Sequence, residues 1–166
     1  MFRMLTALVA AAAIFMPMEA MSLDSPKGKV VLTISGKSVS NPNAGDTAQF
    51  DLEMLEALAG RTATMETMWL QGEHTFSGPF LREVLKAAGA SGSSMKISAL
   101  NEYYAIVPME DADLDTILAT RIDGKKLSVR DKGPLFLIYP FDLDQSLRNE
   151  KYFNRSVWQI KEIEVQ

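Results

Sequence analysis

The segment from residue 67 to residue 85 constrains the fold most, because strand, turn and helix signals follow one another in it. It begins with β-forming residues, continues with polar ones, and from Phe80 onward places apolar side chains on one helical face. Ser77 is suited to cap this helix, Pro79 fits its first position, and Gly89 fits its end. The segment therefore predicts a strand end, a polar loop and a helix. This arrangement often frames a ligand site, although an ordinary surface loop before a helix is the alternative.

Residues 1–22 have the pattern of a secretory signal peptide. Arg3 supplies a positive start, residues 5–18 are mostly apolar, and Ala20 and Ser22 are the small residues of a cleavage site. The apolar run is too short for a comfortable membrane span. We therefore expect export to the periplasm or secretion, with an uncleaved N-terminal anchor as the alternative.

The remaining residues, 23–166, have a length typical of one domain. The chain contains no cysteine, which excludes disulfides, thiolate metal sites, iron–sulfur clusters and covalently attached c-type haem. Its formal net charge is −4 and its basic residues are scattered, so nothing indicates nucleic-acid binding. We expect a single exported domain that depends on packing alone for its stability.

Alternating and continuous apolar patterns predict a strand-rich domain with short helices. Asp51 is placed to cap a helix over residues 52–58, and Asp123-Gly124 is a strong hairpin signal because both turn positions need a positive φ. The continuous apolar run at 135–139 predicts a central strand buried on both faces. The other expected strands cover residues 29–36, 62–70, 95–100, 103–107, 117–122, 126–129 and 155–165.

Several catalytic and metal-binding chemistries lack the residues that they need. His74 is the only histidine and no Gly-x-Ser-x-Gly elbow is present, which disfavours a hydrolytic triad and a zinc site. The aspartates of residues 111–115 imitate the start of a calcium loop, but Thr116 and Ile122 stand where the glycine and the closing glutamate belong. A solvated acidic turn is therefore expected there.

Binding of a flat ring is the chemistry that remains. Aromatic side chains could stack on the ring, polar ones could hydrogen-bond its edge, and bases could meet an anion. Core packing, an ordinary turn and exposed surface charges are the alternatives. The candidate binding residues are Trp69, Tyr103, Tyr104, Glu66, Glu73, His74, Asn101, Glu102, Arg130 and Lys132.

The order of several short motifs resembles the molybdopterin-binding domain of sulfite-oxidase-type enzymes. The motifs extend over nearly all of residues 23–166, and each is weak alone while their order and spacing are more specific. The resemblance implies an α+β fold, a single sulfite-oxidase-like domain with a mixed, strand-rich core. The residues that carry it are Trp69, Gly72, Phe76-Ser77-Gly78-Pro79, Val84-Leu85, Gly89, Tyr103 or Tyr104, Pro108, Asp123-Gly124, Leu127, Gly133-Pro134-Leu135 and Tyr139-Pro140.

One departure from that family changes the expected function. Its enzymes hold molybdenum through a cysteine thiolate between the strand and the helix, whereas residues 64–80 contain no cysteine here. The segments 133–142 and 155–160 resemble small exported members of this fold more closely still. Some of those are periplasmic proteins that report a reduced pterin to the periplasmic domain of a membrane-bound diguanylate cyclase/phosphodiesterase, and so influence cyclic di-GMP.

The resemblance thus implies an exported, non-catalytic pterin-binding protein with a membrane signalling partner. A molybdopterin-dependent oxidoreductase, whose metal the cofactor alone would hold, and an interaction module with an empty pocket are the alternatives. For a reduced pterin, we expect Trp69 to stack first and Tyr103 second, and Glu102 or Glu73 to accept hydrogen bonds from the ring edge. The expected polar and basic neighbours are His74, Asn101, Arg130 and Lys132.

Overall fold

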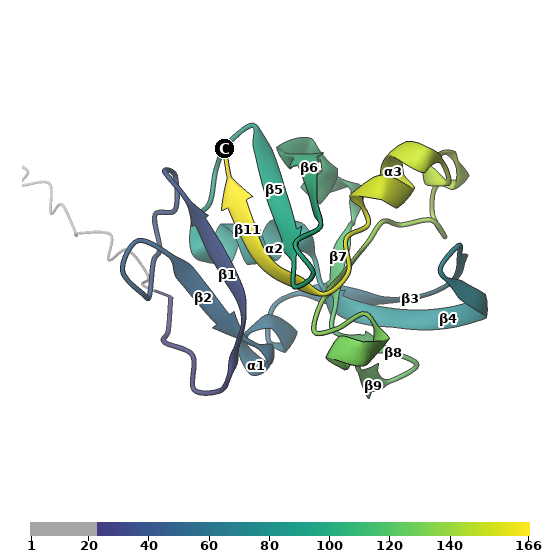
Figure 1. Ribbon diagram of the computed structural model, residues 1–166, viewed down its shortest axis with the longest axis horizontal. Coiled ribbons are helices and arrows are strands. Elements are labelled where there is room, and N and C mark those ends of the chain that lie inside the picture. The colour runs from purple at the N-terminus through teal and green to yellow at the C-terminus, as the bar shows by residue number, and fades with distance from the viewer. Residues whose placement is uncertain (1–22) are drawn as a thin grey trace, which may run out of the picture.

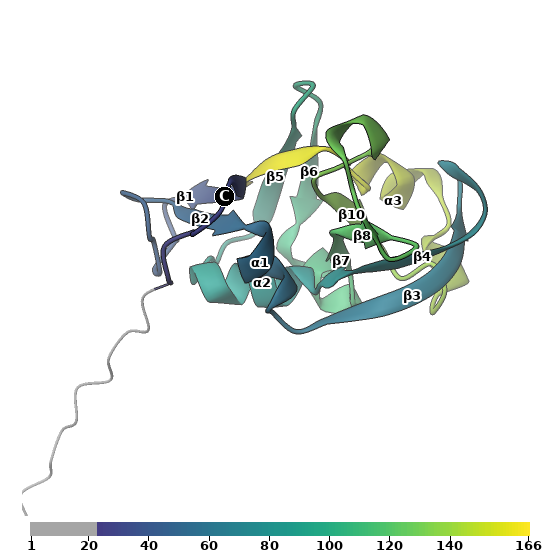
Figure 2. The same cartoon turned by 90° about the horizontal axis from the view of Figure 1, so that it is seen from below.

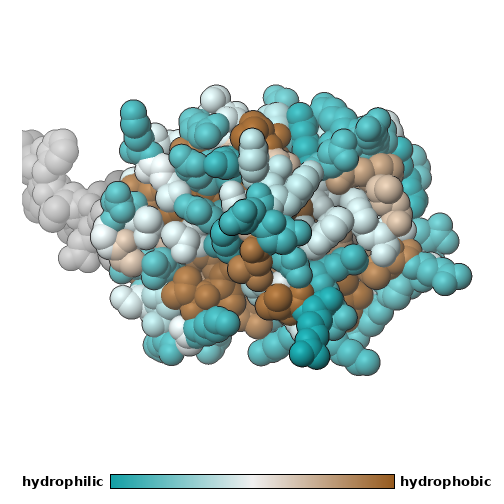
Figure 3. Space-filling view, viewed as in Figure 1, coloured by the Kyte–Doolittle hydropathy of each residue, from teal (hydrophilic) through white to brown (hydrophobic). Residues whose placement is uncertain are grey.

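The computed structural model describes residues 23–166; the predicted signal peptide lies outside the described residues. Its largest sheet has the strand order β2-β1-β11-β5-β6. In Figures 1 and 2, helices α1 and α2 lie on one side of this sheet. The other side is teal or pale over most of the space-filling view, with separate brown areas (Figure 3). The elements are β1 (Val30–Gly36), β2 (Ala48–Asp51), α1 (Leu52–Glu56), α2 (Leu81–Ala88), β5 (Ser94–Ala99), β6 (Tyr104–Pro108) and β11 (Ile160–Val165).

Two smaller sheets complete the fold. One has the order β3-β4-β8-β9 and the other pairs β10 with β7. Three short 3₁₀ helices and one α-helix connect the strands. These elements are β3 (Gly60–Thr67), β4 (Leu70–Pro79), η1 (Met109–Leu114), β7 (Ile117–Ala119), β8 (Arg121–Ile122), β9 (Lys125–Lys126), η2 (Val129–Asp131), β10 (Phe136–Ile138), η3 (Gln145–Leu147) and α3 (Glu150–Arg155). The result is a mixed, strand-rich structure that is compatible with the α+β class.

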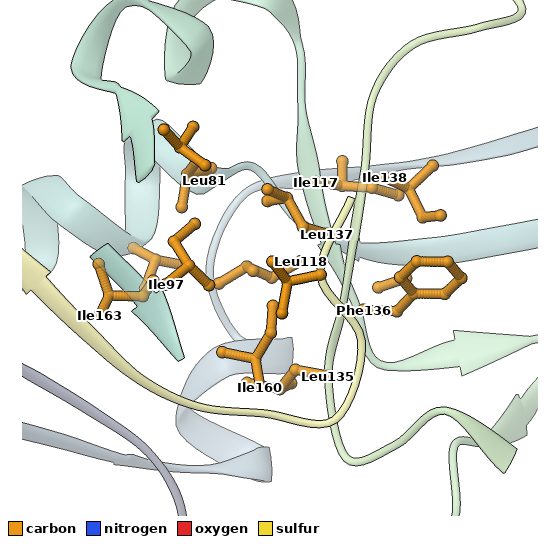
Figure 4. Close-up of a cluster of buried hydrophobic side chains, with 14 of the residues drawn as sticks. Leu81, Ile97, Ile117, Leu118, Leu135, Phe136, Leu137, Ile138, Ile160 and Ile163 are labelled. Atoms are coloured by element: carbon orange, nitrogen blue, oxygen red, sulfur yellow. The ribbon is translucent and has the colours of Figure 1, made fainter. Parts of the chain in front are cut away.

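The first and last strands of the domain lie side by side. β1 and β11 pair in parallel, with Thr33 opposite Glu162, while the other neighbours in this sheet are antiparallel. Apolar side chains of β1, β5 and β11 point to the helix side and are buried there. Figure 4 shows Ile97 and Ile160 of the largest sheet in one apolar cluster with Leu118 of β7.

Local signals were correct where neighbouring residues alone decide the conformation. Asp51 caps α1, since its Oδ1 accepts a hydrogen bond of 2.9 Å from the Met54 N–H. Gly89 ends α2 in the left-handed region at φ 60°. Asp123 and Gly124 form the predicted hairpin turn with φ values of 51° and 75°. The apolar run around β10 is buried throughout; β10 pairs with β7 on one side and forms an isolated bridge from Phe136 to Trp158 on the other.

The predicted polar loop before α2 is wrong. Residues Leu70–Pro79 form strand β4, which pairs with β3 along its whole length and with β8 near its end. Only Phe76 and Pro79 of this strand are buried, while its polar side chains are exposed or half-buried. Ser77 lies within β4, opposite Thr62, and Phe80 occupies the N-cap of α2 without a side-chain hydrogen bond. The prediction for residues 67–85 therefore missed most of strand β4.

The expected solvated acidic turn is wrong at its first residue. Asp111 lies in η1 and is only 3% exposed. The Tyr139 hydroxyl donates to its Oδ2 over 2.7 Å, and Arg155 Nη1 donates to the same oxygen over 2.9 Å. A buried carboxylate is tolerated when such partners replace water. The predicted strand at 155–165 is also shorter than expected, because Arg155 ends α3 and β11 begins at Ile160.

No helix in the described part of the chain has both the length and the apolar character needed to span a membrane.

Candidate functional site

A cavity of about 600 Å³ opens between the β3–β4 turn, the β5–β6 turn, α3 and the segment before β11. This volume lies within the range of small-molecule sites, which is roughly 300–1,000 Å³. Aromatic side chains form its walls, while amide, carboxylate and hydroxyl groups are available at its rim. The lining residues are Met68, Trp69, Asn101, Tyr103, Glu150, Phe153, Asn154, Ser156 and Trp158.

Trp69 lies at the centre of an aromatic cluster behind this cavity. Its ring meets Phe136 at 5.3 Å, Phe153 at 5.8 Å and Trp158 at 6.3 Å between centroids, each in an edge-to-face arrangement. Phe136 also meets Trp158 at 6.0 Å. Each such contact favours one relative orientation of the two rings. The cluster therefore holds both indoles rigidly, and both line the cavity.

Hydrogen bonds fix the segments that surround the cavity. The Tyr103 hydroxyl donates to the backbone carbonyl of Asn154 over 2.9 Å, which ties the β5–β6 turn to α3. Arg148 Nη2 donates to the carbonyl of Glu66 over 2.8 Å, which ties the segment before α3 to β3. Asn149 caps α3 by accepting from the Lys151 N–H over 3.0 Å. Three regions far apart in the sequence, the β3–β4 hairpin, the β5–β6 turn and the stretch around α3, are thus held around one space.

The hydrogen bonds of the buried Asp111 with Tyr139 and Arg155 form a network that anchors α3. Arg155, the last residue of α3, reaches Asp111 from the helix end, and Tyr139, directly after β10, reaches it from the other side of the network. Burial and the hydrogen bond to Asp111 both raise the pKa of Tyr139, so that its hydroxyl stays protonated and donates. The network therefore anchors the helix that carries Glu150, Phe153 and Asn154.

A second groove, of about 460 Å³, lies next to the first cavity and is strongly basic. Lys132 Nζ lies 4.7 Å from the centroid of the Trp158 ring, so this lysine and this indole connect the groove with the aromatic cavity. The lining residues are Leu70, His74, Ile122, Asp123, Lys125, Lys126, Leu127, Arg130, Asp131 and Lys132.

Both carboxylates of this groove already have partners. Asp123 accepts from the Thr75 N–H over 2.9 Å and lies 2.7 Å from His74 Nδ1, while Asp131 accepts from Ser128 over 2.7 Å. The hydrogen bond with Asp123 raises the pKa of His74, assisted by the Gln71 carbonyl 3.1 Å from Nε2, because only the protonated ring donates to both. Conversely, the Thr75 N–H and His74 lower the pKa of Asp123.

The lysine and arginine side chains of the groove, unlike His74, have no such partner. Among the described residues, no carboxylate lies within 4.0 Å of the side-chain nitrogens of Lys125, Lys126, Arg130 or Lys132. The groove therefore has an excess of positive charge that is free to interact with an anion.

The structure divides the residues that the sequence selected between these two places. Trp69, Asn101 and Tyr103 line the aromatic cavity. His74, Arg130 and Lys132 line the basic groove. Glu73 and Glu102 line neither. Glu73 lies opposite Glu66 on the exposed part of the β3–β4 hairpin, and Glu102 occupies the β5–β6 turn at φ 68°.

Sequence reasoning missed the C-terminal half of the cavity. Glu150, Phe153, Asn154 and Ser156 lie in or just after α3, and Trp158 follows. Phe153 and Trp158 are partly buried and pack against the core. Their second role, as cavity wall, depends on the position of α3 next to Trp69. A polar segment with three aromatic rings, Tyr152, Phe153 and Trp158, was the only available signal.

Comparison with known proteins supports the fold. No protein-family model matches the sequence, and no curated protein matches it. Among solved structures, the sulfane dehydrogenase SoxCD from Paracoccus pantotrophus matches with a TM-score of 0.60 and 21% sequence identity. The match covers 81% of this chain and 37% of that chain. The chain therefore shares its fold with part of that dehydrogenase. This chain corresponds to little more than a third of the enzyme subunit's length, so the likeness concerns the fold alone.

Proposed function

We propose that this chain is an exported, non-catalytic protein that binds a reduced pterin and acts through a membrane signalling partner. The observation that carries the proposal is the aromatic-walled cavity of about 600 Å³ in a chain without cysteine. The likeness of the fold to a sulfane dehydrogenase is compatible with a pterin-type ligand but says nothing of signalling.

The residues around the cavity match the chemistry of a pterin. A pterin has a flat face on which an indole can stack. Its N3–H lies beside a 2-amino group, and one carboxylate can accept hydrogen bonds from both. Trp69 and Trp158 supply the indoles, and Glu150 is the carboxylate that lines the same space. Stacking and bidentate pairing each contribute about 1–3 kcal/mol in nucleic-acid recognition, and we expect similar values here. The proposal therefore assigns the ring edge to Glu150 rather than to Glu102 or Glu73.

The basic groove extends the proposed site. Lys132 borders both spaces through its contact with Trp158, and Arg130 and His74 lie beyond it. A pterin whose substituent carries an anionic group could place its ring in the cavity and that group in the groove. The proposal gives His74, Arg130 and Lys132 the ligand-binding role that the sequence suggested.

The residues do not fit a metal held by the protein. The chain has no cysteine to supply the thiolate that molybdenum takes in sulfite-oxidase-type enzymes. Among the described residues, no three histidine, aspartate or glutamate side chains gather in a group that could replace it. The alternative function, a molybdopterin-dependent oxidoreductase, is favoured only by the fold shared with a sulfane dehydrogenase.

Isothermal titration with a dihydropterin tests the binding proposal. Because stacking and bidentate pairing are each worth about 1–3 kcal/mol, Trp158→Leu and Glu150→Gln should each weaken binding by about tenfold or more. Glu164→Gln, an exposed substitution on β11 far from the cavity residues, is the matched control and should leave the affinity unchanged. Equal affinities for all four proteins would place the ligand elsewhere.

The signalling part of the proposal has its own test. Cell fractionation should recover the protein from the periplasm. Deletion of its gene should change the cellular cyclic di-GMP level, and the wild-type gene should restore that level while the Trp158→Leu variant should not. Recovery from the cytoplasm, or full restoration by a variant that no longer binds the pterin, would contradict this part.

A further inference from the structure

Strand β6 is an exposed edge of the largest sheet. It is the last strand in the order β2-β1-β11-β5-β6. Its outward side chains are large and apolar, with Tyr104 54% exposed and Ile106 48% exposed. The opposite edge strand, β2, has only four residues, and three of them are buried. The two edges of the sheet therefore differ: β6 exposes large apolar side chains, whereas β2 is mostly buried.

The backbone of β6 is also available for pairing. The Ala99 N–H donates to the Tyr103 carbonyl over 2.8 Å, and in an antiparallel pair every second residue bonds to the neighbouring strand. Ala105 and Val107 therefore bond to β5, while the N–H and C=O groups of Tyr104 and Ile106 point away from it. No other strand of the described residues pairs with that side.

Helix α3 lies close to β6, but this edge lacks most of the other usual protection. Edge strands commonly carry charged side chains, proline or bulges that prevent a further strand from pairing. Here Pro108 ends the strand, but the two outward positions before it are Tyr104 and Ile106. An apolar, unpaired edge favours the addition of an extended segment from another protein, with main-chain hydrogen bonds for affinity and side chains for specificity.

The charges around the edge indicate what such a segment would contain. Glu102 lies two residues before β6, and Glu110 and Asp113 follow β6 in η1. All three side chains are exposed. The only nearby base on the paired strand is Lys96, whose Nζ lies 4.9 Å from the centroid of the Tyr104 ring. A complementary segment would therefore have apolar side chains in alternation and a basic residue at each end.

The edge is continuous with the proposed ligand site. Tyr103 lines the aromatic cavity and donates to Asn154, and the next residue, Tyr104, begins the exposed edge. A protein seated on β6 would thus lie beside the cavity mouth. We propose that β6 is the docking edge for an extended, apolar segment with basic ends from the signalling partner, an inference that rests on the proposed function.

Amide-resolved NMR titration of the full chain tests this proposal. The probe is a synthetic peptide of alternating valine and threonine with a lysine at each end, and the matched control peptide has glutamates at the ends. We expect the lysine peptide to shift the amide signals of Tyr104 and Ile106 and to slow their hydrogen exchange. Ile106→Lys should weaken its binding at least tenfold, whereas Thr33→Lys, at a half-buried position of the interior strand β1, should not change it.

Each other result overturns the proposal. Absence of shifts at Tyr104 and Ile106, equal binding of the glutamate peptide, or unchanged binding by the Ile106→Lys variant would exclude this edge as the docking strand for a basic segment. A homodimer that Ile106→Lys dissociates would assign the edge to a second copy instead of a partner. Titration of the same sample with a dihydropterin separates the two claims: peptide binding without pterin binding would overturn the proposed function alone, and the reverse would overturn the docking edge alone.

Discussion

Replacement of Asp111 by alanine should destabilise the protein far more than its position in an acidic sequence segment suggests. The carboxylate is 3% exposed and accepts hydrogen bonds from Tyr139 at 2.7 Å and from Arg155 at 2.9 Å. The substitution leaves a fully buried hydroxyl without an acceptor and a mostly buried guanidinium without a counter-charge. Both groups have lost water on folding, so neither regains what the carboxylate provided.

The expected cost follows from these two losses. Removal of one partner from a buried ion pair costs about 3–5 kcal/mol. The Arg155 side chain keeps 19% exposure, so water can solvate part of its charge. We therefore expect the lower part of this range, about 3–4 kcal/mol. Tyr139→Phe removes only the hydroxyl and keeps the ion pair, so it should cost about 1.5–3 kcal/mol, the value of a hydrogen bond to a charged group.

Equilibrium unfolding in urea, monitored by tryptophan fluorescence, measures both changes. Asp113→Ala is the matched control, since Asp113 lies in the same 3₁₀ helix but is exposed. It should change the free energy of unfolding by less than about 0.5 kcal/mol. If Asp111→Ala and Asp113→Ala destabilised the protein equally, the buried network would not carry the stability that its geometry indicates, and α3 would need another anchor.

Three further predictions concern other parts of the fold. Thr67→Val should raise the free energy of unfolding by about 1 kcal/mol, because the buried Thr67 hydroxyl has no hydrogen-bond partner among the described residues; a loss of stability in urea unfolding would reveal a bound water or ligand there. Protonated His74 stabilises the folded state, so this contribution is complete below pH 6.5 and is lost as the pH rises through the raised pKa of the folded protein. Asp123→Asn keeps an acceptor for the turn but removes the charge. The melting temperature of this variant, measured from acidic to alkaline pH, should depend less on pH in this range than that of the wild type. An unchanged dependence would contradict the assignment to His74. Gly78→Ala should destabilise the protein by about 1–3 kcal/mol or more, because a methyl group there would overlap the Leu118 carbonyl oxygen; a neutral effect in urea unfolding would show that the two strands separate easily.

The features that the sequence predicted correctly depend on neighbouring residues. Asp51 caps α1 through an N–H three residues away, and Gly89 and Asp123-Gly124 adopt positive φ values that few other residues tolerate. A motif of this kind has the same meaning wherever the chain places it. Its local geometry could therefore be predicted without knowledge of the tertiary fold.

The features that the sequence did not predict depend on distant partners. The polar residues of β4 become a strand because β3 and β8 offer hydrogen bonds on both sides. Asp111 becomes buried because Tyr139 and Arg155, 28 and 44 residues away, approach it. Composition predicts neither outcome, because the same polar residues could equally remain exposed to water.

Only the residues of the candidate site that come first in the sequence could be predicted. Trp69, Asn101 and Tyr103 could be selected because an aromatic ring or an amide in a turn suggests binding, and they do share one cavity. Trp158 could not, because only its approach to Trp69 at 6.3 Å gives it a position on the cavity wall. The separation of His74, Arg130 and Lys132 into an adjoining groove likewise follows from the three-dimensional arrangement.

The central claim is that the cavity holds a pterin without molybdenum, and one measurement tests it most directly. The protein is purified from the periplasm under reducing conditions and denatured, and the released material is examined by mass spectrometry and elemental analysis. We predict a reduced pterin in near-stoichiometric amount and no molybdenum. Molybdenum together with molybdopterin would contradict the claim and favour the oxidoreductase. Release of neither, with no thermal stabilisation by an added dihydropterin, would leave an interaction module with an empty pocket.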